Sequence, residues 1–338
     1  MTVYFDSGTS NSRLYLIDED KVIDYELKNV GSKDSSITGN NWVLLEGLKQ
    51  MYDAVLARNG LTDANISNLY ASGMVTSPFG IKEVPHLKVP VDRAKLKVGI
   101  YKHYEDIFFK RNINLIPGVK SVPPTDFLDK HNIFEVNSMR GEEVEIFGIL
   151  SCLNKNIRNS NMAIVLPGSH TQIARIQNEE ITDLVSMMSG ELFYAISTST
   201  IISSSIDKNF VNIDFEMVKR AFEIMREYGF NKAVYVINTM RIFDVADKDA
   251  KTSFLEGIIF GGDVICIEKY LKTKWFNIDN IVIYSNKIFA DIYKFLLEII
   301  GLDLNVMVFE KTKERDLAVK GFLEIIQSDD KRGEPYGG

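Results

Sequence analysis

The sequence predicts a two-domain α/β protein from its length, its alternating strand and helix patterns, and a hairpin pattern that occurs twice. The chain has 338 residues, more than one hydrophobic core usually organises. Hydrophobic residues make up 45% and charged residues 25%, which is typical of globular proteins. We expect an N-terminal domain at 1–150, a C-terminal domain at 151–328, a functional cleft between them and a flexible polar tail at 329–338.

Each half of the chain is expected to open with a β-meander. The first has apolar runs at 3–5, 14–17 and 22–27, and residues 8–11 (GTSN) between the first two runs are typical of a turn. Alternating helix and strand patterns follow. Helices are expected at 42–58, 215–228 and 289–300, strands at 69–74 and 281–284, helix ends at Gly229 and Gly301, and a helix surface or loop at 197–205.

Residues 164–185 repeat the plan of the first meander. Aligned without gaps, Gly8 falls on Gly168, whereas Asp6 falls on Leu166. Glycine-containing hairpins are common, so coincidence is one explanation of the similarity. The asymmetry at Asp6 is expected if two related domains bind one phosphate chain and only one of them organises a metal ion.

Charge and cysteine content exclude several classes of protein. The 39 basic and 46 acidic residues give a net charge of -7, which predicts no binding of nucleic acid or an anionic membrane. Cys152 and Cys266 form no CxxC pattern, which argues against a disulfide scaffold or thiolate zinc site and favours a reducing cytosol. We also expect no signal peptide and no membrane span, because every long apolar stretch is interrupted by charges.

Several short strings, in order, resemble the 2-dehydro-3-deoxygalactonokinase family of the actin-like ATPase and sugar kinase superfamily. The resemblance covers nearly the whole chain, and the strings are more specific together than singly. They are 6–13 (DSGTSNSR), 72–77 (SGMVTS), 116–119 (IPGV), 138–143 (SMRGEE), 166–171 (LPGSHT), 188–192 (MSGEL) and 254–257 (FLEG).

The resemblance implies two actin-like (ribonuclease H-like) domains with the active site in the cleft between them. It implies a cytoplasmic kinase that uses ATP and Mg²⁺ to phosphorylate 2-dehydro-3-deoxy-D-galactonate at its 6-hydroxyl, in sugar-acid catabolism. The alternatives are a kinase of another sugar or sugar acid, a non-catalytic protein that binds a sugar acid or nucleotide, and an ATP hydrolase. The oligomeric state is open, with a homodimer as one alternative.

Three positions depart from the family pattern. The family has Trp where this chain has Ser7, and Lys-Trp where it has Gln172 and Ile173. In the family, a glycine-containing turn is expected before a helix late in the chain, on the side that binds adenosine. Here residues 284–287 read YSNK. All three departures concern nucleotide preference and phosphate contacts. Gln172, Ile173 and the missing late glycine also motivate the non-catalytic alternative.

Phosphoryl transfer needs amide donors for phosphate, a carboxylate for the metal and often a carboxylate base. Residues 8–10 can supply backbone N–H groups at a turn, because Gly8 adds no side-chain bulk beside Thr9 and Ser10. The other reading is an ordinary hairpin turn. The resemblance assigns a second phosphate turn to Gly168, Ser169, His170 and Thr171.

Asp6 and the pair Glu142 and Glu143 are the candidate catalytic carboxylates. Asp6 at a strand end is either a turn-forming residue or a ligand that holds Mg²⁺ through water, and a single carboxylate is sufficient for Mg²⁺. Adjacent helical residues point about 100° apart, so only one glutamate can serve as base. By the resemblance Glu142 is the first candidate and Glu143 the second, while both could simply complement a helix N-terminus.

Arg13 and Arg140 are the candidates for binding the substrate carboxylate, because guanidinium matches a carboxylate with paired hydrogen bonds. Each could instead form a structural salt bridge. The resemblance adds Ser72, Gly73, Ser77 and Glu191 as substrate-binding candidates, with helix capping as the alternative for Glu191. The four histidines show no metal-ligand spacing, and neither GxxxxGK[ST] nor GxGxxG occurs.

Overall fold

The computed structural model describes residues 1–123, 125, 127–209, 211–302, 304–312 and 317–328. By its contacts the chain divides into two compact units. The first comprises Met1–Arg158, Glu179–Leu184 and Asp316–Gly338, and the second comprises Asn159–Asn178 and Val185–Arg315. The expected boundaries at 150 and 328 stay predictions for independently folding domains, and the expected tail lies outside the described residues.

The first unit contains a six-stranded sheet of order β3-β2-β1-β4-β7-β6. Strand β1 pairs antiparallel with β2 and parallel with β4, and β2 pairs antiparallel with β3. The expected meander is therefore confirmed. The strands are β1 (Thr2–Ser7), β2 (Ser12–Asp18), β3 (Lys21–Lys28), β4 (Asn68–Gly73), β6 (Tyr101–Glu105) and β7 (Arg111–Leu115).

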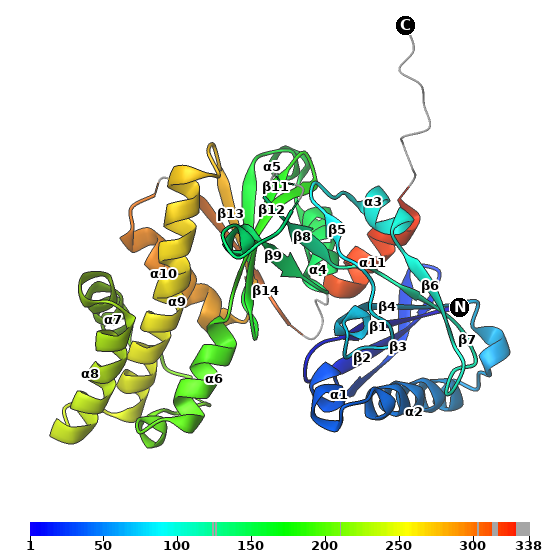
Figure 1. The fold of residues 1–338 in the computed structure, drawn as a ribbon, viewed down its shortest axis with the longest axis horizontal. Helices are drawn as coiled ribbons and strands as arrows, with labels where there is room; N and C mark the ends of the chain where they lie inside the picture. Colours follow the sequence, from blue (N-terminus) through cyan, green and yellow to red (C-terminus); the bar gives the residue numbers. More distant parts are fainter. Residues whose placement is uncertain (124, 126, 210, 303, 313–316, 329–338) are drawn as a thin grey trace, which may run out of the picture. The chain divides into compact units, whose positions relative to one another are not determined.

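Alternation along β1 directs its side chains to two faces of this sheet. Val3 and Phe5 belong to a hydrophobic cluster with the buried side of helix α2 (Trp42–Arg58), which runs along the sheet in Figure 1. Tyr4 points the other way and stacks on Phe322 of helix α11 (Leu317–Gln327), with ring centroids 4.3 Å apart. Asp6 shares the parity of Tyr4, so it belongs to the α11 face.

Helices α4 (Glu142–Cys152) and α11 pack together through two glycines. A Cβ atom on Gly148 would lie 2.0 Å from the Leu317 carbonyl oxygen, and one on Gly321 would lie 1.8 Å from the Val144 carbonyl oxygen. Only glycine allows the helices to approach so closely. The same unit holds α1 (Ser32–Thr38), α3 (Arg93–Val98), α5 (Lys155–Arg158) and a small sheet of β5 (Leu87–Lys88), β8 (Val119–Ser121) and β9 (Asn137–Met139).

The second unit repeats the strand plan of the first. Its strands belong to a sheet of order β12-β11-β10-β13-β14, in which β12 is divided between the two units after Leu184; β10 pairs antiparallel with β11 and parallel with β13. The second expected meander and the strand at 281–284 are confirmed. The strands are β10 (Met162–Leu166), β11 (Thr171–Gln177), β12 (Glu180–Met187), β13 (Asn280–Ser285) and β14 (Asn305–Glu310).

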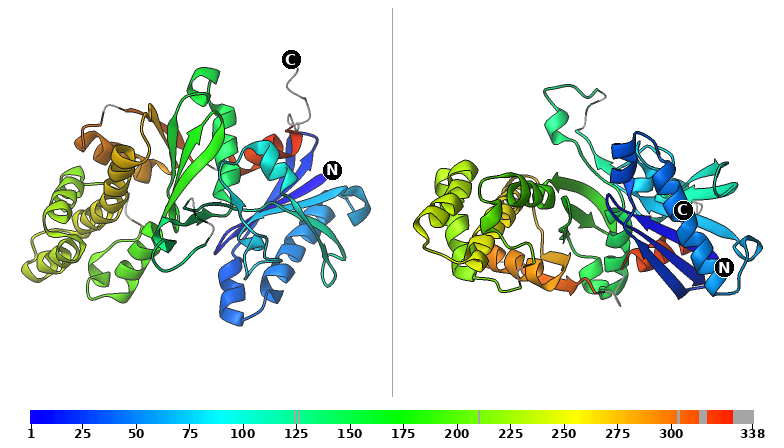
Figure 2. Two further views of the ribbon diagram at one scale, coloured as in Figure 1. Left: turned by 45° about the horizontal axis from the view of Figure 1, so that its top comes forward. Right: turned by 90° about the horizontal axis from the view of Figure 1, so that it is seen from below.

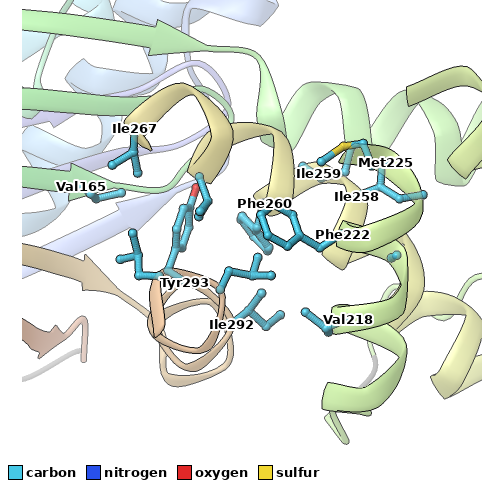
Figure 3. Close-up of a cluster of buried hydrophobic side chains, with 14 of the residues drawn as sticks. Val165, Val218, Phe222, Met225, Ile258, Ile259, Phe260, Ile267, Ile292 and Tyr293 are labelled. Atoms are coloured by element: carbon cyan, nitrogen blue, oxygen red, sulfur yellow. The ribbon is translucent and has the colours of Figure 1, made fainter. Parts of the chain in front are cut away.

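Helices of the second unit pack around the long helix α9, as Figure 2 shows for α7 and α8. Aromatic and branched side chains of α7, α9 and α10 form the core drawn in Figure 3. The expected helices are confirmed, Gly229 ends α7 with φ 84°, and residues 197–205 lie in the end of α6, a loop and a short 3-10 turn. The helices are α6 (Ser189–Ser199), α7 (Phe215–Tyr228), α8 (Phe230–Phe243), α9 (Lys248–Thr273) and α10 (Lys287–Ile299).

The helices of the described ranges include none with the length and apolar character needed to cross a membrane.

Replacing Gly321 by alanine should destabilise the first unit, because the new Cβ atom would overlap the Val144 carbonyl oxygen. We expect a loss of about 1–3 kcal/mol, as for other overpacked sites, measured by thermal denaturation. Gly262→Ala is the control, since a Cβ atom on this helical glycine meets nothing within 4 Å and should be neutral or stabilising. Equal melting temperatures for the two variants would contradict the steric argument.

Candidate active site

Asp6 lies at the end of β1, with one partner on each neighbouring strand. The register places it opposite Arg13 on β2 and Ser72 on β4. The Arg13 guanidinium donates to Asp6 Oδ2 at 2.9 Å, and the two side chains are 38% and 18% exposed. Ser72 is fully buried, and its hydroxyl bonds to the Tyr4 hydroxyl at 2.6 Å. In this structure Arg13 therefore pairs with the candidate metal ligand.

The turn after β1 is braced by the start of helix α1. Gly8 N–H donates to the Asn11 carbonyl, while the Gly8 and Thr9 carbonyls accept from the Ser32 and Lys33 N–H groups at 3.3 and 2.9 Å. A Cβ atom at residue 31, a glycine, would lie 2.4 Å from the Thr9 carbonyl oxygen, so the contact needs glycine. Among the described residues, no backbone partner is found for the N–H groups at positions 9 and 10.

Backbone contact at Gly73 brings β4, β1 and α4 together. Gly73 has φ 82°, and a Cβ atom there would lie 2.4 Å from the Ser7 carbonyl oxygen. Gly141, which precedes α4, has φ 107°, and its Cβ atom would lie 3.3 Å from Gly73 Cα. Only glycine adopts these angles readily. The contact places the first residues of α4 near the end of β1.

Glu142 and Glu143 open α4, as expected, but their surroundings differ. Glu143 is fully buried, and both its carboxylate oxygens accept from Gly141 N–H, at 2.9 and 2.8 Å. Burial and the neighbouring Glu142 charge raise the pKa of Glu143 well above its usual value. Glu142 is partly exposed, and its Oε2 accepts from Arg140 N–H at 3.1 Å.

Burial also raises the pKa of Glu142, to about 7, and the charges of Glu145 and Asp6 act in the same direction. Because α4 begins near the end of β1, the Asp6 carboxylate is one of the charges that act on Glu142. A carboxylate with a pKa near neutral pH is suited to accept a proton.

Arg140 is half-buried, and all three partners found for its guanidinium in the described chain are neutral. It donates to Thr76 Oγ1 at 2.7 Å, to the Val84 carbonyl at 2.8 Å and to His86 Nδ1 at 3.3 Å. Burial lowers the pKa of Arg140, while Glu143 and Glu83 raise it. A half-buried cation held by neutral groups is a suitable partner for an anionic ligand.

Ser77 and Ser72 have hydroxyls that bond inside the first unit. Ser77 Oγ donates to the Met74 carbonyl at 2.7 Å. Ser72 and Ser77 are both buried. Their expected contact with substrate stays a prediction. Sequence reasoning missed Thr76, His86 and the glycine at position 31, because their contacts join segments far apart in the chain.

The turn after β10 is braced in the same way as the first turn, by the start of helix α6. The Ser169 carbonyl accepts from Glu191 N–H at 2.9 Å. A Cβ atom on Gly190 would lie 2.2 Å from the Gly168 carbonyl oxygen. The SGEL string thus has a steric reason for its glycine, and Gly168 and Ser169 are exposed at the turn.

His170 and Glu191 lie beside this second turn. The His170 Nε2 and Glu191 Oε1 atoms are 3.6 Å apart, and both side chains are more than 40% exposed, at 43% and 46%. Thr171 differs, because it is fully buried and its Oγ1 bonds to the Tyr293 hydroxyl at 3.2 Å. The Thr171 side chain therefore points into the unit and not toward the exposed side of the turn.

Asp263 of α9 connects this turn with two helices. Ser189 Oγ lies 2.7 Å from both Asp263 carboxylate oxygens, and the Tyr293 hydroxyl, labelled in Figure 3, donates to Asp263. Thr171 also bonds to this carboxylate. Burial raises the pKa of Asp263, and the bonds from Tyr293 and Ser189 oppose that shift. Sequence reasoning missed this network, which holds the second turn and the start of α6.

The departures from the family pattern have internal roles. Ser7 is buried, and its hydroxyl bonds to Ser12 Oγ at 2.7 Å. Gln172 is buried and accepts from the Ser186 hydroxyl at 2.7 Å, while Ile173 packs in the core of the second unit. Asn286 caps α10, with its Oδ1 accepting from Phe289 N–H at 2.9 Å.

A divalent metal ion would find a carboxylate ligand in Asp6. No group of three or more metal-ligating side chains occurs in the part of the chain that the structure describes. Mg²⁺ keeps most of its waters and needs only one or two carboxylates, so the donor set at Asp6 fits Mg²⁺ better than a metal that requires several side-chain ligands.

Solved structures define the class of the fold. The crystal structure of a protein assigned as a 2-dehydro-3-deoxygalactonokinase from Sinorhizobium meliloti superposes with a TM-score of 0.74 and 21% identity, covering 96% of this chain and 98% of the other. An activator of 2-hydroxyisocaproyl-CoA dehydratase from Clostridium difficile, solved with bound ADPNP, superposes with a TM-score of 0.50 and 9% identity over 96% and 94% of the chains. The fold is that of the actin-like ATPases and sugar kinases, as expected.

Sequence comparison narrows this class to a family. The family described as 2-keto-3-deoxy-galactonokinase matches residues 6–322, and the chain belongs to it. The 2-dehydro-3-deoxygalactonokinase of Escherichia coli (strain K12) is 22% identical over 205 residues, and a Rhizobium meliloti (strain 1021) relative, whose name assigns the same activity, is 26% identical over 202. The aligned regions cover 59% and 60% of this chain, and 61% and 58% of the length of those relatives.

Glu256, within the FLEG string, is a second strongly perturbed carboxyl in α9. It is 3% exposed, and burial raises its pKa from 4.5 to about 8. The folded state thus holds a proton here that the unfolded chain releases near pH 4.5. Between these two values the folded state loses stability as the pH rises, because the unfolded state binds fewer protons.

Glu256→Gln should remove this pH dependence. The free energy of unfolding of the wild type should fall, relative to the variant, by up to about 1.4 kcal/mol per pH unit between pH 5 and pH 8. Urea denaturation followed by tryptophan fluorescence can measure this, since Trp275 is buried in the same unit. Glu298→Gln, at an exposed position on α10, is the control. Parallel curves for wild type and Glu256→Gln would contradict a buried carboxyl that keeps its proton.

Proposed function

We propose that this protein is an ATP-dependent kinase of 2-dehydro-3-deoxy-D-galactonate that phosphorylates the 6-hydroxyl in the cytoplasm, as a step of sugar-acid catabolism. Family membership and the names of the curated relatives support this activity. The observation that carries the proposal is the contact of Gly141 with Gly73, which places Glu142 near the end of the strand that carries Asp6; burial and the charges of Glu145 and Asp6 raise the pKa of Glu142. A homodimer stays a prediction, which light scattering can test.

Glu142 acts as the base in this proposal. Its carboxylate takes the proton of the acceptor hydroxyl as that oxygen forms a bond to the γ-phosphorus, and the bond to the ADP leaving oxygen breaks. Glu142 is the better candidate of the two glutamates because it is partly exposed, whereas both oxygens of Glu143 accept from Gly141 N–H. Glu143 then serves to hold the start of α4.

Asp6 would hold Mg²⁺, which neutralises charge on the phosphates when it is bound. In the structure Asp6 pairs with Arg13, and this pairing orients the Asp6 carboxylate. Arg13 would then support Asp6. Arg140 is the stronger candidate for binding the carboxylate of the acceptor, because its own partners are neutral.

The two turns would bind phosphate in this proposal. Each turn has carbonyls held by a helix start, at α1 and α6, which leaves the opposite side of the turn for ligand. Thr9, Ser10, Gly168 and Ser169 are the residues proposed to contact phosphate, with His170 and Glu191 beside the second turn. Thr171 supports the turn from inside the unit.

A panel of acceptors tests the reaction. Coupled ADP release with Mg-ATP should require 2-dehydro-3-deoxygalactonate, and neutral sugars should be poor acceptors because they lack the carboxylate. Asp6→Asn should lose most activity while its melting temperature stays near that of the wild type. Preference for a neutral sugar would support a different kinase, and ADP release without any acceptor would support a hydrolase. Binding without turnover would support a non-catalytic role.

Glu142→Gln and Glu143→Gln separate the base from its neighbour. Glu142→Gln should lower kcat by about 10²–10⁴-fold, the usual contribution of a positioned base, with little change in melting temperature. Glu143→Gln should lower the melting temperature more, because the amide leaves Gly141 N–H one acceptor oxygen in place of two. The reverse pattern would assign the base to Glu143.

A further inference from the structure

The end of the small sheet in the first unit gathers three residues from separate segments. The register pairs Leu87 with Val119 and Val119 with Met139. The residues that adjoin these in sequence are His86, Gly118 and Arg140. Strands β5, β8 and β9 thereby place an imidazole and a guanidinium side by side at one end of the sheet.

The hydrogen bond between these two side chains fixes the tautomer of His86. A guanidinium is always protonated and has no acceptor, so Arg140 donates and His86 Nδ1 accepts at 3.3 Å. The proton of the neutral ring is then on Nε2. The ring is half-buried, and no hydrogen-bond partner of Nε2 is found within the described ranges. The ring therefore presents an N–H donor beside the half-buried Arg140 guanidinium.

Gly118 holds the ring and the guanidinium in place. A Cβ atom on Gly118 would lie 2.8 Å from His86 Cδ2, 2.6 Å from Arg140 Cγ and 2.4 Å from the Met139 carbonyl oxygen. Both side chains thus pack directly on the glycine. Thr76 completes the support, accepting from Arg140 at 2.7 Å and donating to the Gly73 carbonyl at 2.9 Å.

We propose that His86 is a specificity-determining residue whose Nε2–H donates to the carboxylate of the acceptor acid, beside the Arg140 guanidinium. This inference rests on the proposed function and names a residue that recognises the acid. A neutral imidazole and a cation together match a carboxylate with donors only, whereas a neutral sugar offers hydroxyls that gain little from a buried guanidinium.

The charges around His86 keep the ring neutral at physiological pH. Burial and the positive charges of Arg140 and Lys120 lower the pKa of His86 to about 4. The carboxylates of Glu143 and Glu83 act on the Arg140 side of the pair. The donor at Nε2 is then retained across the neutral pH range, without a change of charge at the ring.

Two substitutions separate direct contact from support of Arg140. In His86→Gln, the amide nitrogen can reach the position of Nε2 and still donate. In His86→Asn, the shorter amide can reach the position of Nδ1 and accept from Arg140, but no donor remains at Nε2. His103→Gln, at a partly exposed histidine on β6 of the same unit, is the matched control.

The test uses steady-state kinetics with saturating Mg-ATP and calorimetric titration with 2-dehydro-3-deoxygalactonate, the proposed acceptor acid. His86→Ala and His86→Asn should raise KM and Kd for the acid by about 10- to 100-fold, the range for a hydrogen bond to a charged group. We expect kcat and the KM for ATP to change little. His86→Gln should recover most of the loss, and His103→Gln should match the wild type.

Recovery by His86→Asn but not by His86→Gln would overturn the inference, because His86 would then act only through Arg140. Unchanged acid binding in all the variants would also overturn it, while the kinase activity of the wild type would still support the proposed function. If the wild type binds no acid in the panel, the inference is wrong; turnover of a neutral sugar would then show a kinase of different specificity.

Discussion

The candidate catalytic groups of the first unit depend on the close approach of three backbone segments at Gly73. A side chain at this position would overlap the Ser7 carbonyl, and one at Gly141 would press on Gly73 itself. Both glycines adopt positive φ angles that other residues rarely accept. Because β1 ends, β4 ends and α4 begins at this contact, Asp6 and Glu142 come within electrostatic range although they are far apart in sequence. The steric fit therefore sets where the two carboxylates lie, while burial is the main cause of the raised pKa of Glu142.

Burial then gives two adjacent glutamates different surroundings. Glu143 points into the unit, where both its oxygens accept from one backbone N–H, and Glu142 keeps partial exposure. A helix separates neighbouring side chains by about 100°, so one residue of the pair must face inward once α4 packs on α11. Residue spacing alone offers no means of choosing between the two; the family resemblance put Glu142 first, and the structure buries Glu143.

Local patterns predicted most of the fold, and contacts between distant segments account for what they missed. Apolar runs separated by turn residues gave both meanders, and apolar spacing gave α2 and α7 with the bounds observed. The family strings led to Asp6, Glu142 and Arg140. They did not reveal that Arg13 pairs with Asp6, nor that Thr171 points inward to Tyr293. His86 carried no signal, because its meaning comes from Arg140, which lies 54 residues away, and from a sheet of three very short strands.

The asymmetry between the two hairpins can now be stated in terms of charge. In both turns, backbone carbonyls accept hydrogen bonds from N–H groups at the start of a helix. A glycine, at position 31 or at Gly190, allows each close contact, so the steric plan is repeated. The first unit keeps its carboxylate, Asp6, on the strand and partly exposed. The second has Leu166 there and supplies a carboxylate from α9, where Asp263 is buried and accepts from Ser189 and Tyr293. A buried carboxyl that already accepts these bonds is suited to holding a turn, and a partly exposed one to binding a cation. The repeat thus preserves the shape of the turn, while the nearby carboxylate is partly exposed in the first unit and buried in the second.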